Sequence, residues 1–524
     1  MSRKKKKPRR RQTSSLAEHK RDGRTLKPPM TALMGDKLRP VVWWRDRLPN
    51  HLWTCWMVSS GDYRDVARAA RILDIVTEAI NSVADGSPDQ QFAGRLTDLE
   101  SLSAAAREAV LSALHGKDAY EDAVPEAFAH ALGMYPDAPG RWLIEPWLAG
   151  GVSIDPVVAQ RELGRVVEGA MDGRGDTATR TKALVFRQYL QGGKLVFSRE
   201  GLPEETRAAI MGYPDRNTDD QNKRAESHFR ATYLVLDDAS DDWCPRFWRS
   251  NWAIFGCNEP APIESPEVID ADSPQAQAVR QELRANVEDL WNHFVRVAQR
   301  VDPDLYEPHR YEVLTGMVGR CLRLLRTVTG YPLMWTMEYG APVLRAVVEA
   351  RISLAYLENS GSVDGYRSFK DYGIGRLKLY KLHLEEVLDE ADEPPSGLED
   401  YVEVLSAFVN RDSFEEFREV DLGGNAFGID MRRMAEKTGF ARDYRLLFAP
   451  ASSNVHGEWG AIEMNVMTIC GNPLHGNHRI LKSRDVTIIG PAFMSDLQGL
   501  ARDLVNDYER ALTGATAEFD GSEE

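Results

Sequence analysis

The sequence predicts a predominantly α-helical protein, with a helical bundle as its C-terminal domain and an α-rich N-terminal domain before it. Apolar residues recur at steps of three and four over many stretches, which is the period of a helix with one buried face. Alternating strand patterns are scarce, and "ATYLVLD" and "DVTIIG" are the two short candidates. At 524 residues the chain exceeds what one hydrophobic core usually supports, so two domains are expected.

The composition is that of an ordinary soluble globular protein, with 43% hydrophobic and 28% charged residues. A run of 18 apolar residues, the length of a membrane span, does not occur in the sequence. The five cysteines are widely scattered and form no CxxC pair, which argues against a disulfide framework and against a zinc knuckle. We therefore expect a cytoplasmic protein without a metal or another cofactor.

The first 36 residues are rich in Lys, Arg, Ser and Pro and lack apolar periodicity, which predicts a disordered basic tail. The tail starts with "MSRKKKKPRRR", and subtracting these eight positive charges from the net charge of −15 leaves −23 on the rest of the chain. Such an acidic body repels nucleic acid on average, whereas the tail attracts it. The expected nucleic-acid-binding residues are Lys4, Lys5, Lys6, Lys7, Arg9, Arg10 and Arg11. The alternative is an arm that only keeps the protein in solution.

The N-terminal domain is expected over residues 37–257. It holds nine of the twelve tryptophans, a density that fits either a core or a surface on which ligands or bases stack. Residues 202–245 are polar and irregular, so no helix is predicted there. The predicted amphipathic helices cover residues 62–83, 95–116, 156–170 and 180–191.

A linker is predicted over residues 258–274, where four prolines and several acids occur. Ser273 and Pro274 are the residue types of a helix N-cap and a first helical position, and a long amphipathic helix follows them. The helical bundle is expected over residues 275–515, with a disordered tail at 516–524. Its further helices are predicted at 310–328, 339–358, 366–390, 399–410, 430–438 and 492–512.

Standard motifs of catalysis and nucleotide binding, such as GxxxxGK[ST], HExxH and GxSxG, are absent from the sequence. Three histidines, His456, His475 and His478, lie within 23 residues of one another. A metal site would need carboxylates or cysteines that converge with them, and the spacing of the nearby acids and Cys470 matches no known ligand pattern. We therefore expect His475 and His478 to be histidines of surface loops.

Arg345 and Glu349 stand four residues apart in "APVLRAVVEARISLAYLEN", close enough to pair on one face of a helix. Two interpretations remain open. The two residues form a structural pair at the helix surface, or they line a groove together with His456.

The stretch "YRLLFAPASSNVHGEW" places His456 after a proline and a small polar cluster. Pro450 should kink or end a helix, and Ser452, Ser453 or Asn454 should cap a new one. His456 would then lie in the first turn of that helix, where the helix dipole favours anions and a neutral imidazole. A neutral histidine near a phosphate fits a general base, and a histidine bonded across the bundle fits a purely structural role.

Three stretches resemble an uncharacterised bacterial family of domain-of-unknown-function proteins: "VLRAVVEARISLAYL", "YRSFKDYGIGRLKLYK" and "YRLLFAPASSNVHGEW". The resemblance covers about residues 320–465, and the family's helical core is similar to the HEPN class of nucleic-acid-associated domains. It implies an RNA-directed protein of a bacterial antiphage or stress system that either cleaves RNA, as a metal-independent ribonuclease, or binds it. His456 would activate a ribose 2′-hydroxyl, Arg345 would stabilise charge on the phosphate, and Glu349 and Asn454 would complete the site.

The chain departs from the HEPN pattern at one position. HEPN ribonucleases carry an arginine that four to six residues separate from the histidine, which corresponds to residues 449–451, and these are Ala, Pro and Ala in this chain. The alternative hypothesis is therefore a function of a different class, that of a non-catalytic helical interaction or scaffold protein. RNA, a protein partner and a second copy of the chain in a homodimer are the partners we expect.

Overall fold

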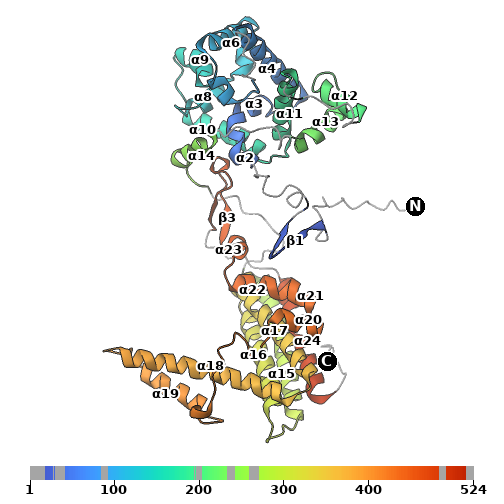
Figure 1. Ribbon diagram of the computed structural model, residues 1–524, viewed down its shortest axis with the longest axis vertical. Helices are drawn as coiled ribbons and strands as arrows, with labels where there is room; N and C mark the ends of the chain where they lie inside the picture. The colour runs from blue at the N-terminus through green and yellow to red at the C-terminus, as the bar shows by residue number, and fades with distance from the viewer. Residues whose placement is uncertain are drawn as a thin grey trace, which may run out of the picture. The chain divides into compact units, whose positions relative to one another are not determined.

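The computed structural model describes residues 18–27, 29, 42–83, 92–193, 195, 203–232, 242–258, 271–482 and 491–514. These residues are predominantly α-helical, and their strands form two small pairs, which confirms the predicted fold class (Figure 1). None of the described helices is long and apolar enough to cross a membrane. The chain divides into two compact units: unit 1 comprises residues 1–260 and 469–479, and unit 2 comprises residues 261–468 and 480–524.

A β-hairpin stands near the start of unit 1, within the segment for which a disordered tail was expected. Strands β1 (Lys20–Asp22) and β2 (Thr25–Lys27) pair antiparallel, with Asp22 opposite Thr25. Gly23 takes a positive φ of 56°, which lets two residues close the turn, and Lys27 pairs with Asp22 at 2.6 Å. The basic residues Lys4 to Arg11 and the C-terminal residues 516–524 lie outside the described residues.

The helices of unit 1 build one hydrophobic core that draws on almost every element. Its helices are α2 (Trp43–Asp46), η3 (Leu48–His51), α3 (Leu52–Met57), α4 (Tyr63–Val83), α5 (Leu96–Glu100), α6 (Ala104–Gly116), α7 (Tyr120–Ala123), α8 (Glu126–Gly133), η4 (Arg141–Ile144), α9 (Glu145–Ala149), α10 (Pro156–Met171), α11 (Asp176–Gln191), α12 (Glu204–Gly212), α13 (Asp219–Thr232), α14 (Trp243–Ile254) and η9 (Pro473–His475).

Most of the tryptophans of unit 1 belong to its core. The side chains of Trp43, Trp53, Trp142 and Trp243 are buried, and each indole N–H donates to a backbone carbonyl at 2.8–3.1 Å. A buried indole needs such an acceptor, because an unpaired N–H in a core costs free energy. The core interpretation therefore holds for these four residues, whereas the ring of Trp252 is exposed.

Helices α12 and α13 correct the expectation that residues 202–245 are irregular. The buried stripe of α13 consists of Asn222, Ala225, Glu226 and Phe229, at helical spacing. Two of these four side chains are polar, so the stripe lacks the apolar periodicity on which the prediction relied. Residues 233–237 of one predicted strand, all of "DVTIIG" and residues 259–270 of the predicted linker lie outside the described residues.

Unit 2 is a helical bundle in which α15, α16, α17 and α24 pack against one another (Figure 1). Ser273 caps α15 by accepting from the N–H of Ala276 at 3.1 Å, as the Ser-Pro pair predicts. The elements of unit 2 are α15 (Pro274–Arg300), α16 (His309–Gly330), η6 (Pro332–Met334), α17 (Met337–Ser360), α18 (Val363–Glu390), α19 (Leu398–Val409), η7 (Glu415–Phe417), α20 (Met431–Thr438), α21 (Ala441–Asp443), η8 (Tyr444–Phe448), α22 (Ala449–Val455), α23 (Trp459–Val466) and α24 (Pro491–Thr513).

Two features extend from this bundle. The far half of α18 and the whole of α19 pair with each other and project from it as a hairpin (Figure 1). After α23, strands β3 (Met467–Ile469) and β4 (Arg479–Leu481) pair and carry the chain out of unit 2 and back, so that residues 469–479 belong to unit 1.

Candidate functional site

A pocket of about 1150 Å³ opens in unit 2 between α16, α17 and α18. Residues 424–431, which lead into α20, and Phe448 of η8 close its other sides. Arg345 and Glu349, the two α17 residues selected from the sequence, both line it. A volume of this size lies at the upper end of small-molecule sites and accommodates a nucleotide.

Arg345 is positioned by one aromatic and one acidic neighbour. Its guanidinium carbon lies 5.2 Å from the centre of the Phe448 ring, in a cation–π contact. Its Nε lies 3.8 Å from Glu349 Oε2, which is an ion pair but too long for a hydrogen bond. The side chain keeps 26% of its surface exposed, so the guanidinium has N–H donors to offer to a ligand in the pocket.

Lys370, which also lines the pocket, forms ion pairs with two acidic side chains of the protein. Its Nζ lies 2.5 Å from Glu312 Oε2 and 3.6 Å from Asp412. Burial by itself would lower the pKa of Lys370, but the hydrogen bond and charge of Glu312, with the charge of Asp412, raise that pKa above its usual value. Lys370 therefore holds its proton and joins α18 to α16, rather than supplying a base.

Cys321 is the thiol of the pocket wall. Burial raises its pKa to about 11, and its S–H donates to the carbonyl of Ala346 at 3.4 Å. A thiol of this kind is protonated at neutral pH, so it is a poor nucleophile. The pocket wall therefore offers no thiolate for covalent catalysis by Cys321.

Flat aromatic faces and methionines supply the apolar part of the wall. Phe369 and Phe427 stack with ring centres 5.6 Å apart and an interplanar angle of 24°. Met431 and Met434 of α20 add adaptable thioether side chains. An aromatic surface beside an arginine fits a planar ligand that also carries negative charge.

His456 does not stand where the sequence suggested. Helices α21, η8 and α22 follow one another without a break from Ala441 to Val455, and His456 is the C-cap at the end of α22. Residues Tyr444–Phe448 form a π-helical turn, and this turn accommodates Pro450, so that the helix continues through the proline. The helix therefore does not end at the proline, and no new helix begins after it. His456 lies at the negative, C-terminal end of the helix dipole instead of the positive, N-terminal end that was expected.

His456 directly follows a residue of the pocket wall in the sequence, but it does not belong to the pocket. Val455 lines the pocket, but the exposed His456 is not one of its lining residues. The His456 side chain makes no hydrogen bond or ion pair to any described residue, so none of these residues orients it. Asn454 donates to the carbonyl of Pro450 at 3.1 Å and accepts from Asn465 at 2.9 Å, which is a structural role.

Of the residues that line the pocket, reasoning from the sequence selected only Arg345 and Glu349. Three of those that it missed show why. Arg320 on α16 and the stacked pair Phe369 and Phe427 come from three separate segments. Helical periodicity shows that Arg320 lies on the exposed side of α16, but not which neighbour it faces. Residues 424–431 carry no periodic signal, so their place over the pocket depends on the tertiary fold.

Residues 311–471 match a family of unknown function, DUF5677. This stretch of unit 2 is thus an uncharacterised domain. The match agrees with the resemblance to such a family over about residues 320–465 and contains every residue of the pocket wall. The comparisons found no curated protein and no solved structure that matches the chain. The function of the pocket has to be argued from its geometry.

Proposed function

We propose that unit 2 binds single-stranded RNA, with phosphates on an exposed basic surface and one unstacked base in the pocket. The resemblance of its helical core to the HEPN class supports a nucleic-acid role, such as that of an RNA-directed protein in a bacterial defence or stress system. The single observation that carries the proposal is that α20 and η8 each contribute side chains both to the basic surface and to the pocket wall.

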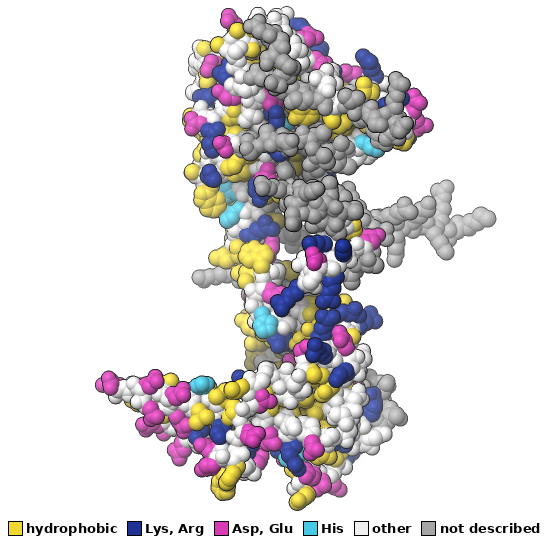
Figure 2. Space-filling model, viewed as in Figure 1, with side chains coloured by type: hydrophobic (Ala, Val, Ile, Leu, Met, Phe, Trp, Pro, Cys, Tyr) yellow, Lys and Arg dark blue, Asp and Glu magenta, His cyan; other side chains and the backbone are white. Residues whose placement is uncertain are grey.

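The basic surface lies on α20, α21 and η8. Five exposed cations share this stretch with three acids, Asp430, Glu436 and Asp443. Arg432 pairs with Glu436 at 3.1 Å and Arg433 with Asp430 at 3.6 Å, and both arginines remain exposed. Figure 2 shows Lys and Arg side chains gathered over this end of unit 2, whereas Asp and Glu dominate the α18–α19 hairpin. The residues of the basic surface are Arg432, Arg433, Lys437, Arg442 and Arg445. Such a local excess of cations on an acidic chain attracts phosphates to this side.

The opposite sides of α20 and η8 enter the pocket. On α20, Met431 and Met434 line the pocket while Arg432 and Arg433 point to solvent. The bases of an RNA strand bound to the basic surface can therefore reach the pocket. Proteins that read single-stranded RNA stack splayed bases on aromatic rings and guanidinium planes. Phe427 and Arg345 provide one of each.

The geometry supports binding more than cleavage. Cleavage without a metal needs a base that is held against the ribose 2′-hydroxyl and a cation on the same phosphate. His456 is exposed and has no described partner that orients it, and Arg345 lies inside the pocket wall that His456 does not join. We therefore assign RNA binding to this site and no chemical step.

Binding is tested by fluorescence anisotropy with a labelled single-stranded RNA. Reversing two cations in Arg432→Glu with Arg433→Glu should weaken binding at least about tenfold and reduce its salt dependence, because two phosphate contacts are lost. Phe427→Ala should weaken binding by about fivefold to a hundredfold, because one base loses a stacking partner. An RNA duplex should bind less tightly than the single strand.

The matched control is Arg161→Glu with Arg165→Glu, two exposed arginines of α10 in unit 1. It changes the net charge by the same amount as Arg432→Glu with Arg433→Glu. An equal loss of RNA affinity in both double variants would show that only the overall charge matters, and it would overturn the assignment of RNA binding to the basic surface. The same RNA is also incubated with the protein in EDTA, and it should stay intact. Cleavage that His456→Asn abolishes would instead make this site a ribonuclease.

A second candidate function, a helical interaction protein that forms a homodimer, is supported by the projecting hairpin. Tyr380, Val387, Tyr401, Val404 and Phe408 of α18 and α19 are all more than a third exposed. Apolar side chains gathered on a paired-helix surface are typical of sites where another helix pair docks. Light scattering after gel filtration should therefore give a dimer.

Tyr380→Lys with Val404→Lys should convert that dimer to a monomer, because two charges would be buried between the copies. Tyr339→Lys, an equally exposed position on α17, should leave the dimer intact. A wild-type protein that is monomeric at micromolar concentration would rule out this candidate.

A further inference from the structure

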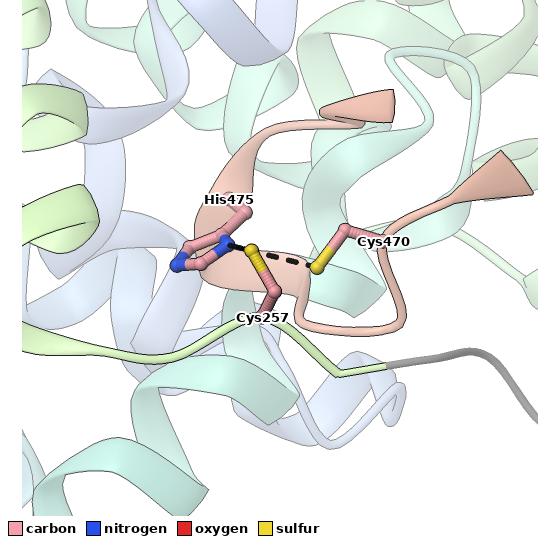
Figure 3. A group of neighbouring side chains, drawn as sticks. All are labelled: Cys257, Cys470 and His475. Atoms are coloured by element: carbon pink, nitrogen blue, oxygen red, sulfur yellow. Dashed lines mark hydrogen bonds between the residues drawn. The ribbon is translucent and has the colours of Figure 1, made fainter. Parts of the chain in front are cut away.

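Two cysteines and one histidine meet at one point of unit 1, where α14 ends and residues 469–479 return. The Sγ atoms of Cys257 and Cys470 and a ring nitrogen of His475 all lie within 4.8 Å of one another (Figure 3). Cys257 is exposed, whereas Cys470 and His475 are buried. The burial of His475 corrects the expectation that it belongs to a surface loop.

We propose that Cys257, Cys470 and His475 bind a Zn²⁺ ion through three protein ligands, with a water molecule in the fourth position. The expectation of no metal site rested on sequence spacing alone. That spacing could not show the group, because Cys257 precedes His475 by 218 residues.

The distances are those of ligands around a shared tetrahedral ion. His475 Nδ1 lies 3.5 Å from Cys257 Sγ and 3.6 Å from Cys470 Sγ. Zinc bonds of about 2.3 Å to sulfur and about 2.0–2.1 Å to nitrogen place the two atoms roughly 3.5 Å apart at a tetrahedral angle. Both nitrogen–sulfur distances therefore match this separation.

Hydrogen bonding alone does not explain this arrangement. His475 Nε2 lies 3.1 Å from the carbonyl oxygen of Phe255, which only accepts, so Nε2 carries the proton and Nδ1 has the lone pair. One lone pair on Nδ1 accepts one well-aligned hydrogen bond, yet two sulfurs point at it. A histidine whose second nitrogen is bonded to a backbone carbonyl is also the usual form of a zinc ligand.

The surrounding backbone holds the ligands in place. The N–H of Asn472 lies 3.4 Å from Cys470 Sγ, and such a donor stabilises the thiolate form that a metal requires. The Asn472 side chain donates to the carbonyl of Gly256 at 2.9 Å and accepts from the N–H of Leu474 at 3.0 Å. These bonds join the segment after α14 to the segment that carries Cys470 and His475.

A turn completes the arrangement on the far side of His475. Gly476 has a positive φ of 55°, and a Cβ there would lie 2.6 Å from the ring of Trp44. Only glycine fits this position, so the turn after η9 is closely defined.

Thiolate and imidazole ligands together favour Zn²⁺ over harder cations such as Mg²⁺.

The first test measures zinc in the full-length protein purified without chelators. We expect about one zinc per chain, and background levels in Cys257→Ser, Cys470→Ser and His475→Ala, because a site with three protein ligands is left with only two when one of them is removed. The neighbouring His478→Ala is the matched control and should keep its zinc. Zinc that survives Cys470→Ser, or is lost from His478→Ala, would overturn the assignment of ligands.

A second test does not depend on variants that fold. Wild-type protein stripped with a chelator is titrated with Co²⁺, which should give thiolate charge-transfer bands and the intense visible bands of a tetrahedral site. Cys257→Ser, a substitution at an exposed position, should lose these bands. An absence of these bands in the stripped wild type, or a thiol count that reveals a Cys257–Cys470 disulfide, would refute the proposal.

Discussion

Glu226→Ala is expected to destabilise unit 1 by about 3–5 kcal/mol, because it leaves the charge of Arg180 buried without its partner. Arg180 Nε lies 3.3 Å from Glu226 Oε1, and the two side chains are only 7% and 4% exposed. The hydroxyl of Tyr213 also donates to Glu226 at 3.2 Å. The pair holds α13 against α11, so its loss should loosen α13 first.

Denaturant unfolding followed by tryptophan fluorescence measures this effect, since nine of the twelve tryptophans lie in residues 43–252. Glu205→Ala is the matched control. Glu205 also pairs with an arginine, Arg224, at 2.5 Å, but its side chain is 83% exposed. Its loss should cost at most about 1 kcal/mol, because water screens an exposed ion pair. Equal effects of the two substitutions would contradict the buried position of Glu226.

Replacing both buried partners gives a further check on the cause. Arg180→Met with Glu226→Leu removes the two charges together and fills a similar volume. Such replacements of buried ion pairs are often neutral or stabilising, so the double variant should recover most of the stability lost in Glu226→Ala. If the double variant is as unstable as the single one, packing and not charge explains the loss.

Trp335→Ala should destabilise unit 2 by about 3–5 kcal/mol, because it removes a large side chain from a closed core. Trp335 follows η6 and is 0% exposed, and its indole N–H donates to the carbonyl of Thr329 at 3.3 Å. It therefore fills the core beside the C-terminal end of α16 and also satisfies a carbonyl there. Hydrogen exchange in α16 and α17 should quicken in this variant.

Trp459→Ala provides the comparison within the same unit. Trp459 begins α23 and is 58% exposed, so its removal should change stability by less than about 0.5 kcal/mol. A small effect of Trp335→Ala would mean that the unit 2 core is packed differently from the structure described above. Both residues lie inside the stretch that matches the family of unknown function, so the test also probes that domain.

The sequence by itself determined the helical class and most of the long helices. Ser273 and Pro274 predict where α15 begins, and its apolar face predicts the helix that follows. The same helical period of apolar residues predicts α17 and α24. The pairing of Arg345 with Glu349 also follows from a spacing of four residues on one helix. Each of these features depends on residues within a few turns of each other.

The tertiary structure decided everything that depends on contacts between distant residues. Pro450 was expected to end a helix, but a π-helical turn next to it accommodates the proline and moves His456 to the helix end. Helix α13 was missed because it buries Glu226 against Arg180, a partner 46 residues away in the sequence. Cys257 meets His475 only because residues 469–479 return to unit 1. Local patterns record the period of an element, whereas the side chain that it faces is set by long-range packing, which no local pattern contains.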